Sequence, residues 1–444
     1  MGNRRLNTVI KIIIITLVAA SVIVMLLNLL ILKSSDGYNQ MRALYKQPQD
    51  SIDVLFVGSS LVYSDISTGV LWDEYGIASY DLGAAEAPSW VSYYQLKEAL
   101  KTQHPKVICY EASLPGMQAI QYQKDTWSSA TNYGFKWSRD RIEELRVNSA
   151  EDDFYKRLNP FNIMHGRYND LSEKDFDDRT DLEAFKGFVP KERVEEIEPT
   201  VLTGTDEMDP CSDKSEEYVR KIIQLAKDQG VPLIMFASPR KIGEPAERAY
   251  NYMDSIARSE GLEFIDFNKR YSDMDLDFSC DMAEALHLNY SGNYKFSKYL
   301  GQVLKERYDI PDRRGDDRYV SWDRDALLQR RDRNNKNIQN SSSAEEVMQL
   351  AQDRYILFLI NDGMAGILDN NQSVALQEVD ENGEKLFRLT YRYGDDSFIF
   401  TETNNQGERM IHLFINDLDH EEFYGNILMV YDAVTNEYIG WEYF

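Results

Sequence analysis

The chain has 444 residues and 43% hydrophobic residues, enough for two globular domains with real cores. Its formal net charge of −25 argues against a nucleic-acid-binding protein, which needs a basic face for the phosphates. Three cysteines (Cys109, Cys211 and Cys280) are too few for a disulfide framework and lack metal-ligand spacing, although a single Cys211–Cys280 bridge stays open.

Residues 12–32 form an uncharged segment with only three polar side chains. A bilayer core takes ~20 apolar helical residues, so the segment predicts a transmembrane anchor. Arg4, Arg5 and Lys11 precede it, and this positive side predicts residues 1–11 in the cytoplasm and the rest outside the plasma membrane, in a single-pass topology. A cleaved signal peptide is the alternative, but its apolar core would be shorter, and no small-residue cleavage site follows Leu32.

Residues 33–50 read as a polar tether, and an alternation of strands and helices begins at residue 51. Strands are expected at 52–57, 78–82, 106–110, 231–237 and 262–267, and helices at 67–75, 88–102, 213–227, 245–259 and 291–307. Alternation at this spacing predicts βαβ units, and so an α/β domain over residues 51–310 with a parallel sheet and helices on both faces.

The alternation lapses over residues 112–205, where aromatic residues recur among charged ones. We interpret this stretch as an inserted lid that is helical or irregular, since disordered segments are poor in aromatic residues. Its aromatic side chains could line a groove for a sugar acceptor or could simply form a local core.

Two further segments complete the chain. Residues 311–343 are rich in Asp, Arg and Asn and are interpreted as a charged linker that could be partly helical. Residues 344–444 contain seven short strand-like runs, with a hairpin signal at Asp380-Glu-Asn-Gly383, and predict a small β-rich domain with a binding or accessory role.

The chemistry is indicated by two short stretches that lie far apart. Gly58-Ser59-Ser60 ends the first strand, and ligands of open α/β sheets gather at such carboxyl ends. A serine nucleophile needs a base. His287 is preceded three residues earlier by Glu284, a carboxylate that can orient it, and a helix follows at once.

Gly58-Ser59-Ser60-Leu61 and Glu284-Ala-Leu-His287 resemble the first and last blocks of the SGNH/GDSL esterase–acyltransferase superfamily. Gly83 in Asp81-Leu-Gly83 matches its second block, whereas Glu111-Ala-Ser113 stands where the third block, Gly-x-Asn-Asp, is expected. The Gly-Ser-Ser and His-Leu-Asn-x-x-Gly forms most resemble the membrane-anchored branch that acylates cell-envelope polymers (DltD-like).

The resemblance implies a flavodoxin-like sheet and a Ser-His-acid mechanism of acyl transfer. Ser60 would be the nucleophile, His287 the base and Glu284 the acid, with Asp281 as the substitute if Glu284 points away. The amides of Ser60 and Gly83 would form the oxyanion hole, and neither a cofactor nor a metal is expected. The implied partners are an envelope or secreted glycopolymer, or a teichoic-type polymer, and a membrane-bound O-acyltransferase that supplies the acyl group.

Three alternatives stay open. The protein could be a glycan O-deacetylase, or a membrane-anchored adaptor that binds glycan without catalysis. Acidic residues also occupy positions 1, 3, 5, 9 and 12 of an EF-hand-like loop, although position 6 is Phe278 rather than the turn glycine. These acidic residues are Asp273, Asp275, Asp277, Asp281 and Glu284. A calcium ion there would occupy Glu284 and prevent it from orienting His287.

Overall fold

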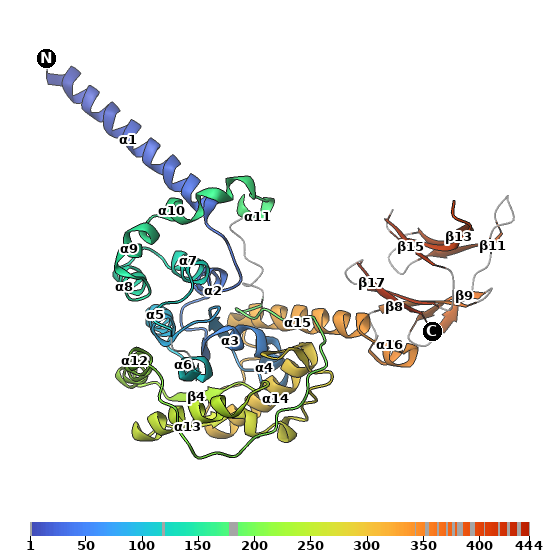
Figure 1. Cartoon of the computed structure of the whole chain (residues 1–444). Coiled ribbons are helices and arrows are strands. Elements are labelled where there is room, and N and C mark those ends of the chain that lie inside the picture. Colours follow the sequence, from blue (N-terminus) through green and yellow to red (C-terminus); the bar gives the residue numbers. More distant parts are fainter. Residues whose placement is uncertain are drawn as a thin grey trace. The chain divides into compact units, whose positions relative to one another are not determined.

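The computed structural model of the chain divides into two compact units, Met1–Arg330 and Arg331–Phe444, which are described separately (Figure 1). The described residues are 2–117, 120–176, 185–341, 343–350, 355–361, 364–369, 372–374, 378–379, 385–390, 396–403, 405–415, 418–423, 427–432 and 437–443.

The first unit is built around a five-stranded parallel sheet in the order β2-β1-β3-β4-β5. Its strands are β1 (Val54–Gly58), β2 (Ser79–Gly83), β3 (Val107–Glu111), β4 (Leu233–Ala237) and β5 (Phe264–Asp266). This confirms the predicted α/β fold and its flavodoxin-like strand order. In such a sheet the order reverses between β1 and β3, so ligands are expected at the carboxyl ends of these two strands.

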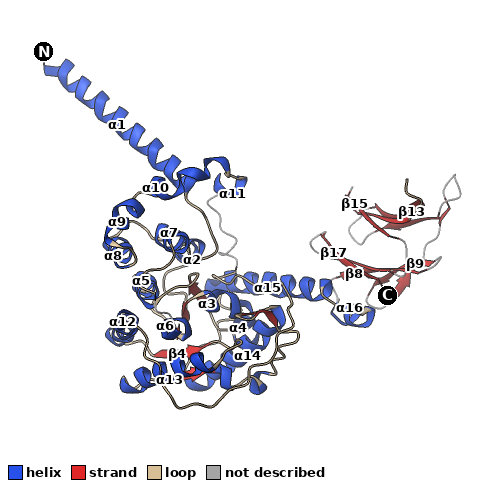
Figure 2. Ribbon diagram, viewed as in Figure 1, coloured by secondary structure: helices blue, strands red, loops and turns tan. Residues whose placement is uncertain are grey.

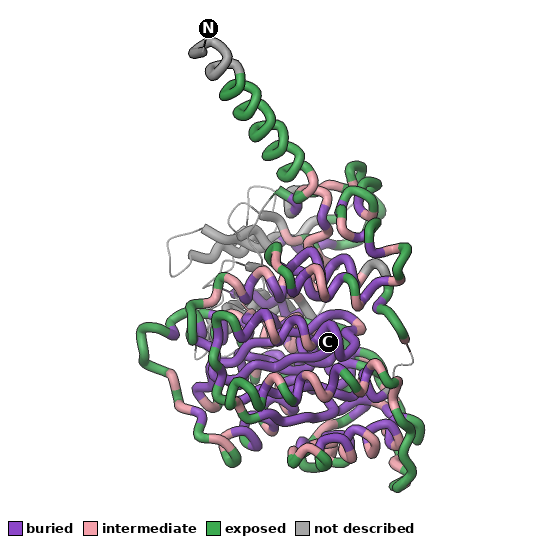
Figure 3. Tube along the Cα trace, turned by 90° about the vertical axis from the view of Figure 1, so that its left-hand side faces the viewer, coloured by how far each residue is buried: buried purple, intermediate pink, exposed green. Residues whose placement is uncertain are grey.

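Helices cover both faces of the sheet, which is buried between them (Figures 2 and 3). On one face α5 (Ser89–Ala99), α12 (Asp213–Gln229) and α13 (Glu244–Ser259) pack on strand residues such as Leu55 and Ile108. On the other face α3 (Ser60–Asp65), α4 (Thr68–Tyr75) and α14 (Tyr290–Arg307) pack on Phe56 and Cys109. Adjacent strand residues thus enter different cores, as the alternation of side chains along a strand requires.

The chain begins with α1 (Gly2–Leu30), whose stretch Val9–Leu30 is exposed and is long and apolar enough to cross a membrane. The segment predicted as a polar tether contains α2 (Tyr38–Leu44), whose Met41 and Leu44 are buried in the core of the sheet domain. Two turns of helix are too short to show a clear apolar period, so sequence patterning missed them.

The inserted stretch is helical in its first two thirds. Its elements are α6 (Ser113–Met117), α7 (Asp125–Gly134), α8 (Arg139–Val147), α9 (Glu151–Leu158), α10 (Pro160–Met164), the 3₁₀ turn η1 (His165–Asn169) and α11 (Glu173–Phe176). Residues 188–211, which we call the strap, follow without helix or strand. The strap is held by backbone bonds from Val189 to the carbonyl of Tyr63 (2.6 Å) and from Glu195 to that of Met282 (2.9 Å).

The predicted charged linker contains η5 (Asp317–Tyr319) and the long helix α15 (Val320–Gln339). Tyr319 and Trp322 are buried, with their rings 6.2 and 6.4 Å from that of Trp72 in α4. Lys186 is buried as well, and its ammonium lies 2.9 Å from Asp325 and 4.0 Å from the centre of the Trp322 ring. A partly helical linker was open from the sequence, but its packing on the first unit could not be predicted, because only a few apolar residues anchor the helix.

The second unit contains α16 (Ala344–Leu350) and two five-stranded antiparallel sheets, ordered β10-β9-β8-β16-β17 and β11-β12-β13-β14-β15. The first sheet consists of β8 (Tyr355–Asn361), β9 (Met364–Asp369), β10 (Gln372–Val374), β16 (Ile427–Asp432) and β17 (Glu437–Tyr443). The second consists of β11 (Glu378–Val379), β12 (Lys385–Thr390), β13 (Asp396–Thr403), β14 (Arg409–Ile415) and β15 (Leu418–Phe423). This confirms the predicted β-rich C-terminal part. The turn predicted at Asp380–Gly383 lies outside the described residues.

Replacement of Trp322 by alanine is expected to destabilise the first unit by ~3–5 kcal/mol, since it removes a fully buried indole and leaves a cavity beside Trp72. Urea unfolding of the full chain in detergent, followed by far-UV circular dichroism, measures this change. Val320→Ala on the same helix, at a side chain that is 57% exposed, is the control and should change stability by less than ~0.5 kcal/mol. Equal effects of the two substitutions would contradict the packing role of Trp322.

Candidate active site

Ser60 is placed at the carboxyl end of β1 by a tight strand-to-helix turn. Gly58 ends the strand with φ +157°, and a Cβ there would lie 2.8 Å from the Cβ of Glu111, so only glycine fits without a shift. Ser59 caps the next helix, since its hydroxyl accepts a hydrogen bond from the amide of Leu61 (3.3 Å). Ser60 is therefore the first residue of α3, and its side chain is only partly buried.

His287 lies on a small antiparallel hairpin formed by β6 (Met282–Glu284) and β7 (His287–Leu288). Its Nε2 lies 2.9 Å from Ser60 Oγ, and its Nδ1 lies 2.6 Å from Glu284 Oε1. A carboxylate can only accept, so Nδ1 carries the proton and Nε2 is free to accept from the Ser60 hydroxyl. The three side chains thus form one continuous chain of hydrogen bonds.

The hairpin explains why Glu284 contacts the histidine. Glu284 and His287 are cross-strand partners, so their side chains project from the same face of a two-residue turn. Asp281, the substitute acid, is buried elsewhere: its Oδ2 accepts from Lys295 Nζ (2.7 Å) and from the amide of Asp277 (2.7 Å). Both ring nitrogens of His287 are already occupied, so Asp281 makes no hydrogen bond to it.

Burial lowers the pKa of His287, because desolvation disfavours the imidazolium. The hydrogen bond and negative charge of Glu284 oppose this shift, while the positive charges of Lys191, in the strap, and Arg240 add to it. The imidazole is therefore neutral at neutral pH, as a proton acceptor must be.

Gly83, which the sequence indicates as an oxyanion donor, ends β2 directly beside Gly58. A Cβ at this position would lie 2.6 Å from the carbonyl oxygen of Ser59 and 3.0 Å from the ring of Tyr63. The residue must be glycine because the start of α3 passes this close. Its part in stabilising an oxyanion stays a prediction.

Sequence reasoning missed a group of buried ionisable residues behind Ser60 and His287. Glu111 ends β3, is fully buried, and accepts hydrogen bonds from the amides of Ser113 and Ser238 (3.3 Å each). Asp65, at the end of α3, accepts from the amide of Leu288 (3.0 Å) and so ties the hairpin to the helix that carries Ser60. The only sequence signal was the position of Glu111 in place of the third family block.

Arg240 follows β4 and is the buried cation of this group. Its guanidinium donates to Tyr250 Oη from Nε (3.1 Å) and Nη2 (2.7 Å). Its positive charge acts on Glu111, Asp65 and His287. Burial nevertheless raises the pKa of the Glu111 carboxyl, and that of Asp65 well above its usual range. Burial thus shifts both acids toward their protonated forms.

The side chains of the EF-hand-like pattern and of two cysteines have positions that bear on a calcium site and on a disulfide. Asp281 is paired with Lys295 and Glu284 contacts His287, so neither is available to the EF-hand-like pattern. Among the residues described above, no three potential ligands cluster as a metal site would require. Cys211 and Cys280 are both free, so the bridge is not formed.

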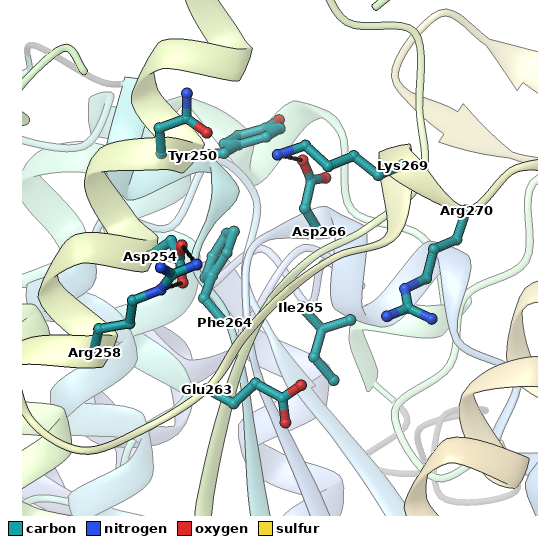
Figure 4. A pocket seen from close by; sticks show the side chains of 10 residues that line it. Tyr250, Asp254, Arg258, Glu263, Phe264, Ile265, Asp266, Lys269 and Arg270 are labelled. Carbon is teal, nitrogen blue, oxygen red and sulfur yellow. Dashed lines mark hydrogen bonds and ion pairs between the residues drawn. The ribbon is translucent and has the colours of Figure 1, made fainter. Parts of the chain in front are cut away.

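A cavity of about 210 Å³ lies at the outer edge of β5, and neither Ser60, Glu284 nor His287 lines it (Figure 4). Four of the charged side chains around it pair with one another: Arg258 with Asp254 (2.6 Å), and Lys269 with Asp266 (3.7 Å). Glu263 and Arg270 pair with Arg307 and Asp273, which do not line the cavity. These pairs give no indication of a ligand for the cavity.

Comparison with known proteins gives distant structural neighbours. No family model and no curated protein matches the sequence. Among solved structures, a Bacteroides fragilis protein described as an acylhydrolase has a TM-score of 0.30 and 10% identity, covering 59% of this chain and 92% of its own. A gut microbial diltiazem-metabolizing enzyme has a TM-score of 0.22 and 10% identity, covering 81% of this chain and 60% of its own. Both scores are low, so the function of this chain has to be inferred from its own residues.

Glu111→Gln is expected to raise the melting temperature by a few degrees at neutral pH. Glutamine keeps an acceptor for the two backbone amides and removes a carboxyl whose ionisation is disfavoured by burial. A folded-state pKa above the unfolded value means that the wild type loses stability as the pH rises past ~4.3, so the advantage of glutamine should vanish near about pH 4.

Differential scanning fluorimetry of the full chain from pH 4 to pH 8 measures this effect. Glu217→Gln is the control, since Glu217 is exposed on α12 and pairs with Lys221 at the surface. A pH-independent difference between Glu111→Gln and the wild type would show that the carboxyl charge is not the cause.

Proposed function

We propose that the protein is an extracytoplasmic serine acyltransferase or esterase that acts on O-acyl groups of a cell-envelope or secreted polysaccharide, or of a teichoic-type polymer. The observation that carries this proposal is the chain of contacts from Ser60 Oγ through the His287 imidazole to Glu284. A serine, a neutral imidazole and an orienting carboxylate in this order are the parts that acyl transfer through a serine ester needs.

In the first half-reaction Ser60 Oγ attacks the acyl carbonyl, and its proton passes to His287 Nε2. Glu284 holds the Nδ1 proton and stabilises the imidazolium that forms. Collapse of the tetrahedral intermediate releases the alcohol of the donor, which takes the proton from His287. The acyl group is then an ester of Ser60.

In the second half-reaction a hydroxyl group attacks that ester, and His287 accepts its proton. If the hydroxyl belongs to a sugar or polyol unit, the acyl group is transferred; if it is water, the acyl group is hydrolysed. In both cases His287 returns the proton to Ser60. The same residues therefore serve a transferase and an esterase, and access of the acceptor decides between them.

The oxyanion of each intermediate would be held by the amides of Ser60 and Gly83. The Ser60 amide is at the first position of α3, where a helix leaves its amides without intrahelical acceptors. Such a donor typically contributes ~3 kcal/mol to transition-state stabilisation.

The length and apolar composition of α1 support an anchor in the plasma membrane, and the basic residues before it support a cytoplasmic N-terminus, which would place the reaction outside the cell. By family resemblance, a membrane-bound O-acyltransferase would supply the acyl group across that membrane. The β-rich second unit would hold the glycopolymer as an accessory module.

Two other functions differ from this one by measurable outcomes. A glycan O-deacetylase would use the same three residues but would turn over acyl esters rapidly in water alone. A non-catalytic adaptor would retain polymer binding after loss of Ser60. The contact between Ser60 and His287 favours either enzyme over the adaptor.

Ser60→Ala is expected to abolish hydrolysis of p-nitrophenyl acetate by the full chain, with a loss of ~10³-fold or more in kcat/KM. It should also abolish covalent labelling by a fluorophosphonate probe, which reacts with activated serines. Acylation of the surface polymer in cells should be lost with it. Unchanged acylation and labelling in this variant would overturn the catalytic proposal.

The two candidate acids are separated by a matched pair of variants. Glu284→Gln should lower kcat by ~10²-fold or more, because the imidazole loses its orienting carboxylate. Asp281→Asn should reduce stability, because it leaves Lys295 without its partner, while kcat per labelled serine is retained. The reverse pattern would assign Asp281 as the acid.

The pH profile of kcat/KM should rise as His287 loses its proton, with a midpoint below the usual histidine value of ~6.5. Lys191→Gln should move this midpoint upward, since it removes a positive charge that lowers the His287 pKa. Arg193→Gln, at a side chain 75% exposed on the same strap, is the control and should leave the midpoint unchanged. A midpoint that Lys191→Gln does not move would contradict this electrostatic role.

A further inference from the structure

Three large aromatic side chains are exposed near the end of α1, where this helix joins the rest of the first unit. Phe161 in α10 is 51% exposed, and Tyr168 in η1 and Phe176 in α11 are each 67% exposed. All three elements contact α1, and α10 and α11 flank its lower end in Figure 1. Scattered exposed aromatic residues are ordinary, but three on consecutive elements around one apolar helix form a local cluster.

These elements are fixed to the end of α1 by polar contacts. Arg167 donates from Nη1 to the carbonyl of Leu30 (3.0 Å) and pairs through Nη2 with Asp175 (2.8 Å). Lys33 in turn donates to the carbonyl of Asp175. A small apolar cluster that includes Ile31 and Met164 completes the junction. The exposed rings therefore have a defined position along the helix.

That position can be compared with the thickness of a bilayer. The apolar stretch Val9–Leu30 has 22 residues. At ~1.5 Å per residue it is ~33 Å long, close to the ~30 Å of a hydrocarbon core. If the stretch spans the membrane, Leu30 lies at the outer boundary of that core, and whatever is bound to Leu30 lies at the level of the lipid head groups.

We propose that residues 160–176, which we call the collar, rest on the outer leaflet of the membrane that holds α1. The side chains of Phe161, Tyr168 and Phe176 enter the boundary between head groups and acyl chains. This inference depends on the proposal that α1 spans the membrane, and it adds a second, peripheral contact to that anchor.

The chemistry of the collar fits a lipid surface. Aromatic rings are enriched at both membrane–water interfaces, where an apolar body meets the acyl chains and a polar tip stays among the head groups. Tyr168 provides such a tip, and Arg167 and Lys33 place positive charge at the same level, close to the lipid phosphates. The collar lies directly beside the apolar helix α1. A lipid surface is therefore a better partner for its exposed rings than a soluble protein.

The collar has a consequence for the position of Ser60. Asp36 is six residues beyond Leu30, a span of at most ~20 Å. Its carbonyl accepts from the amide of Ala85 (2.9 Å), and its Oδ1 accepts from the hydroxyl of Tyr63 (3.0 Å), one turn of α3 after Ser60. A folded segment, rather than a loose tether, thus connects the membrane to α3 and would limit how far Ser60 can lie from the head groups.

The test uses the full chain in vesicles of phosphatidylcholine and phosphatidylglycerol. Cys211 and Cys280 are replaced by serine, and one cysteine at a time is introduced at Phe161, Tyr168 or Phe176 and labelled with bimane. Lipids brominated near the carbonyl end of their acyl chains then quench any label at that depth. Circular dichroism melting of each variant verifies that it is folded.

Two reference positions make the result decisive. Trp137→Cys is the matched control, because this side chain is aromatic and 66% exposed but lies between α7 and α8, outside the collar. Val22→Cys, which lies ~12 Å deeper than Leu30, reports on α1 itself and is tested with lipids brominated near the methyl ends of their acyl chains. We expect severalfold stronger quenching at the three collar positions than at 137.

Quenching of the label at residue 22 without quenching at the collar positions would refute the contact of the collar with lipid, while the transmembrane anchor would stand. No quenching at 22 would refute the membrane span, and the collar with it. Similar quenching at 137 and at the collar would show a general approach of the insert to lipid and would refute a specific contact.

Discussion

The hydrogen bond between Ser60 Oγ and His287 Nε2 is the contact on which the functional interpretation of this structure depends. It joins two residues that are 227 positions apart in the sequence. Ser60 without a base would be a weak nucleophile, and His287 needs the serine to form an acyl ester. The sheet makes it possible: β1 delivers Ser60 at the point where the strand order reverses, and the chain returns there after β5.

Much of this arrangement could be predicted from the sequence. The five strands and the long helices have strong apolar patterns, and the glycines and serines at strand ends mark the turns. Glu284 and His287 could be paired because a short spacing limits how far apart they can lie. The turn that pairs them, a two-residue hairpin, could not be predicted, since neither strand exceeds three residues.

Other parts depend on tertiary contacts that leave no local pattern. Glu111 and Arg240 look like surface residues in the sequence but are buried at the carboxyl ends of β3 and β4, which are paired side by side in the sheet. Helix α15 looks like a linker because only a few of its residues, such as Trp322, enter a core. Each is stabilised by partners far away in the chain, which sequence periodicity cannot reveal.

Burial and nearby charges also affect the protonation of the ionisable groups around the site. Burial lowers the pKa of His287, and the positive charges of Lys191 and Arg240 add to this shift. Burial also raises the pKa of Glu111 and Asp65, so it works against negative charge on these two carboxyls. A neutral base can exist there in a chain whose overall charge is strongly acidic.

The site is made of two separable halves. Ser60 belongs to α3, whereas Glu284 and His287 are cross-strand partners on one hairpin. Among the described residues, two hydrogen bonds join the hairpin to α3: that of Ser60 with His287 and that of the Leu288 amide with Asp65. A small displacement of the hairpin would disarm the nucleophile while leaving the imidazole correctly oriented, so that reversal of the displacement would restore the assembled site at once.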